Sequence, residues 1–154
     1  MNFSAPGEPI RSETRPTFPR RAVVTAGMPY GNKDLHFGHI GGVFVHADIF
    51  ARFLRDRIGK ENVLFVSGTD CYGSSIVEAF RIAVAENGFR GDIEQFVRHN
   101  HELQKASLSS FDISLNLYAA SALDGPAKTH QEVCEKLMRM LFQEGHLTQR
   151  SGQQ

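Results

Sequence analysis

The chain has 154 residues, which is enough for one domain with a sizeable hydrophobic core. Its 17 Lys and Arg balance its 17 Asp and Glu, and this neutrality excludes the strongly basic surface with which a protein holds a polyanion unaided. The two cysteines, Cys71 and Cys134, form neither a disulfide framework nor a Cys-x-x-Cys pair, so no metal ligands and no zinc are expected in this segment.

The chain opens with a proline-rich stretch and continues into a strand. Four of the six prolines fall in residues 1–19, beside Ser, Glu and Arg, which predicts a flexible N-terminal tail. The tail lacks the apolar run of a secretory signal, and no later stretch resembles a membrane span, so we expect a cytoplasmic protein without a membrane partner. Residues 21–26 are mostly β-branched or small and predict a strand, which Pro29 and Gly31 end.

Two histidines, His36 and His39, flank Gly38 between this strand and a helix predicted over residues 41–57. The helix is indicated by apolar residues three or four positions apart, namely Val43, Ala47, Ala51, Leu54 and Ile58. The first N–H groups of a helix lack partners and attract anions, so phosphate fits this junction. Both imidazoles can donate hydrogen bonds to phosphate oxygens, and Gly38 leaves room for an adenine ring or a ribose. On its own, the His-x-Gly-His pattern also fits an ordinary surface turn.

A second block follows the next strand. Residues 62–67 are largely apolar and predict a strand of a parallel sheet, and residues 68–73 read Gly-Thr-Asp-Cys-Tyr-Gly directly after it. In doubly wound sheets, ligands bind beyond the carboxyl ends of the strands, so both blocks are expected at the same crevice. Asp70 would there either pair with an ammonium group or cap the helix that follows Gly73.

The rest of the chain is mainly helical. The expected elements are a helix over 74–86 closed by Asn87-Gly88, a helix from the N-cap Asp92 to about Leu108, an extended segment over 113–118, and a last helix with Pro126 in its first turn, an apolar line of Val133, Leu137 and Leu141, and an end near Gly145. Strands that alternate with helices, without hairpin signals, predict an α/β fold with parallel strands.

Residues 28–39, Met-Pro-Tyr-Gly-Asn-Lys-Asp-Leu-His-Phe-Gly-His, resemble the signature loop of the class I aminoacyl-tRNA synthetases, in which this loop binds ATP. The prefix Gly-Met-Pro-Tyr and the Gly-Thr-Asp-x-Tyr-Gly block look like the methionyl-tRNA synthetase family. Tyr72 and the stretches 101–105 and 110–114 are similar to the archaeal and eukaryotic-like branch of that family. The resemblance runs from about Arg20 to the end of the chain.

This resemblance implies a fold and a set of site residues. Residues 20–154 would form the N-terminal half of the catalytic domain, that is, the first half of a Rossmann-like nucleotide-binding domain, ending before the family's connecting insertion. The catalytic residues would be His36 and His39. The ATP-binding residues would be Asn32, His36, Gly38 and His39. The methionine-binding residues would be Gly27, Met28, Tyr30, Asp70 and Tyr72.

The implied reaction is activation of methionine by ATP to methionyl-adenylate, with Mg²⁺ bound to the ATP, followed by transfer to tRNA in the complete enzyme. The sequence contains no Lys-Met-Ser-Lys-Ser loop of that family, so we expect this fragment to be inactive alone. It departs from the family at Cys71, where Glu or another polar residue is usual, and at Gly27 and Met28, where Ala and Leu are common. Two other interpretations remain open: a stand-alone small nucleotidylyltransferase, which would lack the Gly-Thr-Asp block, and a non-catalytic, synthetase-like binding module.

Overall fold

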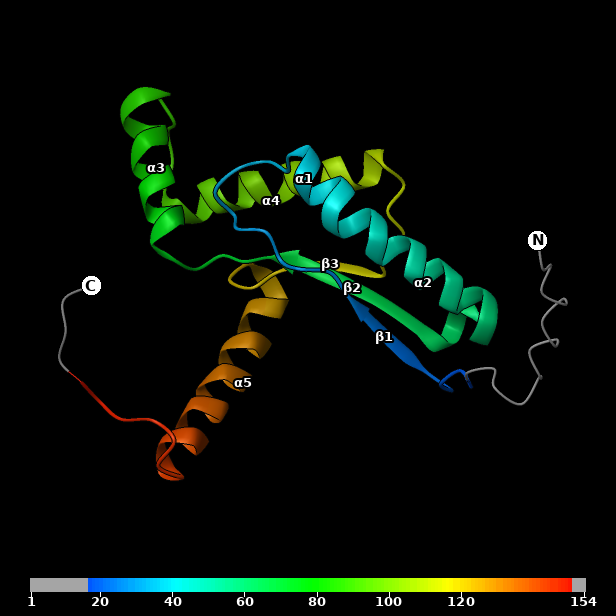
Figure 1. Cartoon of the computed structure of the whole chain (residues 1–154). Helices are drawn as coiled ribbons and strands as arrows, with labels where there is room; N and C mark the ends of the chain where they lie inside the picture. The colour runs from blue at the N-terminus through cyan, green and yellow to red at the C-terminus, as the bar shows by residue number, and fades with distance from the viewer. Residues whose placement is uncertain (1–16, 151–154) are drawn as a thin grey trace, which may run out of the picture.

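Three parallel strands form the centre of the computed structural model, which describes residues 17–150 (Figure 1). They are β1 (Ala22–Thr25), β2 (Val63–Thr69) and β3 (Leu117–Ala120), and they lie side by side in the order β1-β2-β3. The predicted α/β fold with parallel strands is confirmed. β2 runs two residues beyond its predicted end, because Gly68 and Thr69 pair with Ala119 and Ala120 of β3.

Helices connect the strands and lie on both sides of the sheet (Figure 1). In chain order they are α1 (Phe37–His39), a π-helical turn (Ile40–Phe44), α2 (Val45–Ile58), a 3₁₀ turn (Lys60–Asn62), α3 (Ser74–Glu86), α4 (Ile93–Ser110) and α5 (Asp124–Gln143). α1, the π-helical turn and α2 follow one another without a break, so helical structure begins four residues before the predicted start at residue 41. α3 has its predicted bounds, and α4 starts after its predicted cap, Asp92.

One face of the sheet is buried against α2 and α4. Val24 of β1 and Phe65 of β2 enter a cluster with Phe44, Leu54 and Leu108, and Phe65 is fully buried. A second cluster joins α3 and α4 to the end of β3, and its buried members are Ile76, Ala83, Phe96, Val97, Ala120 and Leu123. Together the two clusters fix the helices that flank the carboxyl ends of the strands.

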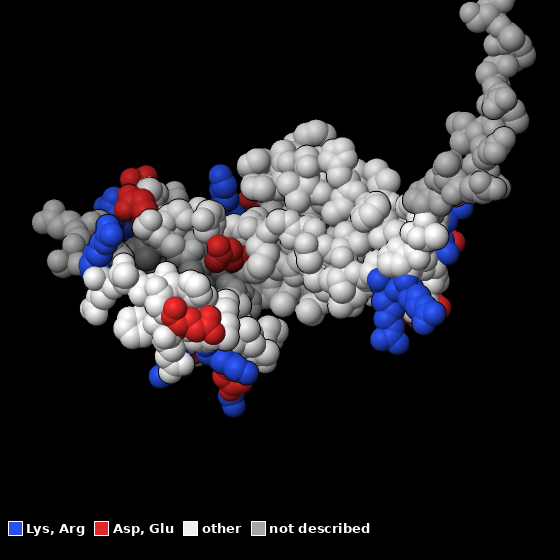
Figure 2. Space-filling view, turned by 60° about the horizontal axis from the view of Figure 1, so that its bottom comes forward, with Lys and Arg blue, Asp and Glu red and all other residues white. Residues whose placement is uncertain are grey.

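The opposite face of the sheet carries apolar side chains that remain exposed. Val23, Leu64 and Leu117 alternate with the buried residues of their strands and are 66%, 47% and 52% exposed. Figure 2 turns this side toward the reader, and charged side chains gather near its two ends and leave the middle largely uncharged. α5 lies on this side (Figure 1) and contains no buried residue, so the predicted line of Val133, Leu137 and Leu141 does not enter the core.

The third strand starts later than the sequence predicts. The extended segment is expected over residues 113–118, whereas the ladder with β2 spans Leu117–Ala120. Polar side chains explain the shift, because Asn116 accepts a hydrogen bond from the Phe65 N–H at 2.8 Å through its side-chain oxygen, and Ser114 contacts α2. Residues 113–116 therefore link β2 to α2, and the strand begins after them.

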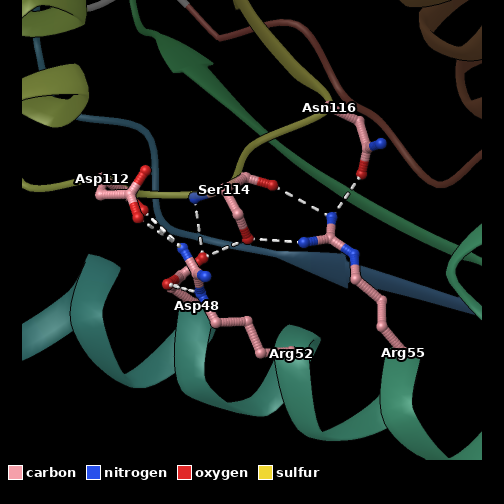
Figure 3. Close-up of polar contacts among 6 residues, drawn as sticks. All are labelled: Asp48, Arg52, Arg55, Asp112, Ser114 and Asn116. Carbon is pink, nitrogen blue, oxygen red and sulfur yellow. Dashed lines mark hydrogen bonds and ion pairs between the residues drawn. The ribbon is translucent and has the colours of Figure 1, made fainter.

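Asp48 anchors this link to α2 (Figure 3). Its carboxylate is buried and accepts hydrogen bonds from the Ser114 N–H at 2.8 Å, the Ser114 hydroxyl at 2.5 Å and Arg52 Nε at 2.6 Å. Arg55 donates to the carbonyl oxygen of Ser114 at 3.0 Å and to Asn116 Oδ1 at 2.8 Å. Burial alone would raise the pKa of Asp48, but the bonds from Ser114 and Arg52 outweigh burial and lower that pKa. The cluster holds α2, and with it the π-helical turn, against the sheet.

Candidate functional site

The two predicted site loops lie side by side at the carboxyl edge of the sheet. One follows β1, the other follows β2, and an isolated backbone bridge joins Tyr30 to Asp70. The Asp70 N–H donates to the carbonyl oxygen of Pro29, and the Gly31 N–H donates to that of Asp70, each at 2.8 Å. The predicted convergence of both motifs on one edge of the sheet is therefore confirmed.

His36 and His39 cap the helix that begins between them. The Gly38 N–H donates to His36 Nδ1 at 3.1 Å, and the His36 N–H donates to His39 Nδ1 at 3.4 Å. This is a capping box in which imidazoles stand where a hydroxyl and a carboxylate are usual. A Cβ at Gly38 would lie 3.0 Å from His36 Cε1, so glycine gives the His36 ring its space.

The caps determine which nitrogen of each imidazole remains a donor. Because both Nδ1 atoms accept N–H bonds, each neutral ring carries its proton on Nε2. The two rings stack with their centroids 3.9 Å apart. Burial lowers the pKa of His39, and the nearby His36 and Lys33 lower it further, so His39 is neutral at pH 7. Two adjacent Nε2–H groups at the start of a helix suit the oxygens of a phosphate.

A polar pocket of about 180 Å³ opens beside the histidines. It is lined by Pro29, Tyr30, Asn32, Lys33, Asp34, His36, His39 and Gln104. Four predicted site residues are thus brought together here, namely Tyr30, Asn32, His36 and His39. The side chain of Asn32 is half-buried, and within residues 17–150 it makes no hydrogen bond, so its amide is available to a ligand.

An apolar hollow of about 260 Å³ lies on the other face of the sheet, between the strand ends and α5. Its wall includes Thr25, Val66, Gly68, Leu117 and Ala119 of the strands, Pro126 and His130 of α5, and Met28. Met28 is a predicted site residue, and it directly follows Gly27, whose carbonyl accepts a hydrogen bond from Ser67 Oγ at 3.4 Å. Tyr72 stacks on His130 with ring centroids 6.1 Å apart, which brings Tyr72 next to this hollow.

Asp70 is the first residue of the second loop, directly after β2. It is half-buried, and its Oδ1 accepts a hydrogen bond from the Tyr72 N–H at 3.1 Å. The alternative that Asp70 caps the following helix is wrong, because Gly73 is the N-cap of α3 and receives no side-chain bond. Among residues 17–150, the Asp70 carboxylate is therefore engaged only within its own loop, and an ammonium group can reach it there.

A buried polar group beneath the loops is not anticipated by the sequence reasoning. Its members are Thr69, Asn100, His101, Gln104 and Tyr118. Three of them lie on the face of α4 that also carries Phe96, Val97 and Leu108. Polar residues that interrupt the apolar face of a helix need buried partners, and this interruption is the sequence signal that could have identified the three residues of α4.

The described part of the chain, residues 17–150, has no helix long and apolar enough to cross a membrane. In the same residues, no group of three or more His, Cys, Asp or Glu is placed to hold a metal ion. The charged side chains in the wall of the polar pocket, apart from the histidines, are Lys33 and Asp34.

Comparison with known proteins decides the family. A family model described as tRNA synthetases class I (M) matches residues 22–154. The chain belongs to this family. The methionine–tRNA ligases of Bacteroides fragilis and Cytophaga hutchinsonii are each 33% identical to it, over 135 and 136 residues, and that of Haloquadratum walsbyi is 34% identical over 142 residues. These matches cover 88%, 88% and 91% of this chain, but 18%, 18% and 17% of the relatives.

Solved structures agree with this class I synthetase assignment. A Mycobacterium tuberculosis methionyl-tRNA synthetase in complex with methionyl-adenylate aligns with a TM-score of 0.63 and 25% identity, over 80% of this chain and 21% of that one. A second structure of that enzyme, also bound by methionyl-adenylate, aligns with a TM-score of 0.57 and 26% identity, over 68% and 19%. The expected Rossmann-like fold and the resemblance to methionyl-tRNA synthetases are confirmed. The chain spans about a fifth of the length of these synthetases.

Proposed function

We propose that this chain is the methionine- and ATP-binding portion of a methionyl-tRNA synthetase, with residues 20–154 as the N-terminal half of its catalytic domain. The observation that carries the proposal is the polar pocket, where the Nε2–H donors of His36 and His39 flank the start of a helix at the carboxyl edge of the sheet. The family match and the adenylate-bound relatives support it. The complete enzyme would charge tRNA in the cytoplasm, where translation consumes the product.

The proposed reaction needs no side-chain nucleophile. A carboxylate oxygen of methionine attacks the α-phosphorus of ATP, and the bond from that phosphorus to the bridging oxygen breaks to release pyrophosphate. Charge grows on the phosphate oxygens, and the Nε2–H groups of His36 and His39 stabilise it. Mg²⁺ enters bound to ATP as its counterion, and alignment of the two reactants supplies the rest of the rate gain.

The same edge can hold the amino acid. Asp70 would pair with the α-ammonium group, because its Oδ2 makes no hydrogen bond within residues 17–150. Met28 and the apolar hollow beside it suit a thioether side chain, with Gly27, Tyr30 and Tyr72 completing the surroundings. Asn32 and Gly38 would contact the nucleotide at the polar pocket.

Isothermal titration with a non-hydrolysable methionyl sulfamoyl adenosine tests the proposal on the full chain. We expect this adenylate analogue to bind, and the leucyl analogue to bind at least about tenfold more weakly, since it lacks the thioether. His36→Ala combined with His39→Ala should lower the affinity about a hundredfold or more, because two hydrogen bonds to charged oxygens are lost. The matched control is His146→Ala, an exposed histidine beyond α5, which should leave the affinity unchanged.

Absence of binding, or equal affinity for the leucyl analogue, would contradict the proposal. We expect the chain alone not to support methionine-dependent exchange of pyrophosphate into ATP, and exchange at a normal rate would show that this portion is sufficient. Nucleotide transfer that does not need methionine would favour the stand-alone nucleotidylyltransferase. A protein partner that is retained by the double histidine variant would favour the binding module.

A further inference from the structure

We infer that Gln104 is a positioning residue of this site, whose amide sets the loop before His36 against the end of β2 that precedes Asp70. The catalytic meaning of this inference rests on the proposed function, whereas its structural part rests on the contacts of Gln104 alone. Gln104 is fully buried in the middle of α4, and it also reaches the wall of the polar pocket.

The amide nitrogen of Gln104 holds the loop. Nε2 donates to the carbonyl oxygens of Tyr30 and Lys33, each at 2.8 Å. A side-chain amide has two N–H hydrogens, so both are used, and both acceptors belong to the main chain. Between them, Asn100 Nδ2 donates to the carbonyl oxygen of Gly31 at 3.2 Å. Three carbonyl groups of this loop are thus bound to side chains of one helix, α4.

The amide oxygen of Gln104 binds two residues of the sheet. Oε1 lies 2.8 Å from the Thr69 hydroxyl and 2.8 Å from the Tyr118 hydroxyl. Because Nε2 faces two carbonyl oxygens, the orientation of the amide is fixed, and both hydroxyls donate to Oε1. Thr69 Oγ1 then accepts from His101 Nδ1 at 2.8 Å, which requires the proton of that ring to be on Nδ1. Every donor and acceptor in this chain of contacts has one assignment.

Close packing leaves the loop no room to shift while these bonds hold. Gly31 is buried, and a Cβ at this position would lie 2.9 Å from Val97 Cγ1 and 3.0 Å from Thr69 Cγ2. The loop backbone therefore rests directly on α4 and on the last residue of β2. If Gln104 moves, the backbone at Tyr30 moves with it. His36 follows five residues later on the same loop, so its position changes too.

An amide of this length is required at position 104. Glutamate would set a carboxylate oxygen against two carbonyl oxygens, and asparagine is one methylene too short to reach both sides. Methionine has nearly the same volume as glutamine but donates no hydrogen bond. Gln104→Met therefore removes the bridge while keeping the packing of α4.

Amide hydrogen exchange in the full chain, followed by NMR without ligand, tests the structural part. The N–H groups of Gly31 and Asp70 form the bridge between the two loops, and the Ala26 N–H, bonded to the sheet, serves as the internal reference. In Gln104→Met we expect exchange at Gly31 and Asp70 to accelerate roughly thirtyfold relative to Ala26, because two neutral hydrogen bonds to the loop are lost. Unchanged exchange ratios would overturn the inference, whether or not any ligand binds.

Leu108→Ala is the matched control, since Leu108 is buried on the same helix within the core cluster and its side chain makes no hydrogen bond to the loop. It should lower global stability and leave the ratios of Gly31 and Asp70 to Ala26 unchanged. If Gln104→Met does not fold, Tyr118→Phe removes one donor to Oε1, and we expect a roughly fivefold acceleration at the same amides. No acceleration in Tyr118→Phe would likewise overturn the inference.

Titration with methionyl sulfamoyl adenosine separates the positioning role from the proposed function. We expect the affinity of Gln104→Met to fall about tenfold and that of Leu108→Ala to stay within about twofold, because a loosened loop must be ordered again on binding. If exchange accelerates as expected but the unmodified chain does not bind the analogue, the positioning by Gln104 is upheld and the proposed function is overturned.

Discussion

The two faces of the sheet differ in what they bury. On the side of α2 and α4, Phe65 and Thr69 are fully buried, and Thr69 is hydrogen-bonded to its neighbours. On the side of α5, Val23 and Leu64 stand in solvent near the apolar hollow that Met28 lines. Parallel sheets usually bury both faces. The described residues therefore gain their stability mainly from the buried face, whereas the opposite face keeps apolar side chains exposed.

Neighbouring residues of β2 give the strongest test of this difference. Phe65→Ala removes a fully buried ring, and we expect the free energy of unfolding to fall by about 3–5 kcal/mol. Leu64→Ala, one position away on the opposite face, should cost about 1 kcal/mol, since this side chain is 47% exposed. Urea unfolding followed by circular dichroism measures both losses. Equal losses would show that the two faces are buried alike.

Loss of the hydrogen bonds between Asp48 of α2 and the segment 113–116 should lower stability nearly as much. Asp48→Ala leaves the Ser114 N–H and Arg52 Nε without their acceptor, and we expect a loss of about 2–3 kcal/mol. Asp56→Ala is the matched control, because Asp56 is exposed on the same helix, and it should change stability by less than about 0.5 kcal/mol. A comparable loss in both variants would show that any change on α2 lowers stability, and that the hydrogen bonds of Asp48 have no special part in it.

The pH dependence of stability gives a second test of Asp48. Its pKa is lowered in the folded chain, so its contribution to stability is present above the unfolded pKa of about 3.9 and is lost as the pH falls through the folded pKa. Between about pH 7 and about pH 3, the unmodified chain should therefore lose more stability than Asp48→Ala does. Urea unfolding at both pH values measures the difference, and parallel losses would contradict this role of Asp48.

Elements with local signals are predicted well by the sequence. Asp92 and Gln95 form the reciprocal cap that starts α4, and Gly88, with φ of 66°, follows the end of α3. The start of helix at Phe37 is missed, because imidazoles are not among the usual N-cap side chains. The shift of β3 is also missed, because it depends on a hydrogen bond that the Phe65 N–H donates to Asn116 Oδ1, 51 residues away.

The candidate site is predicted only in part, for the same physical reason. Motif position is enough to bring Tyr30 and Asp70 to one edge, and the structure joins them there. The support beneath them is not local, since Gln104 bonds to Lys33 across 71 residues of sequence. The position of Gln104 on the buried face of α4 indicates that its amide needs partners, but it does not indicate which residues those partners are. Contacts of this range follow from packing in three dimensions, which residue periodicity does not encode.

A weaker, pH-dependent effect is expected at His101, on the side of α2 and α4. Burial lowers the pKa of His101, so the unfolded chain takes up this proton at a higher pH than the folded chain does. Stability is then complete above the unfolded pKa of about 6.5 and declines as the pH falls below it, by no more than about 1.4 kcal/mol per pH unit. His101→Gln keeps a donor for Thr69, and its stability should decline less between about pH 7.5 and about pH 5.5. If urea unfolding gives equal declines for the unmodified chain and for His101→Gln, protonation of His101 does not lower the stability.

The smallest effect is expected on the α5 side. Val23→Thr places a hydroxyl on a side chain that is 66% exposed, and the free energy of unfolding should change by less than about 0.5 kcal/mol. Val24→Thr, the next residue, places the same hydroxyl on the buried face and should cost about 1–2 kcal/mol. Because an exposed apolar face promotes association, both variants should be unfolded at two protein concentrations. A loss in Val23→Thr that equals that of Val24→Thr and grows with concentration would show that a second copy covers this face, since only an interface between chains makes the cost of the hydroxyl depend on concentration.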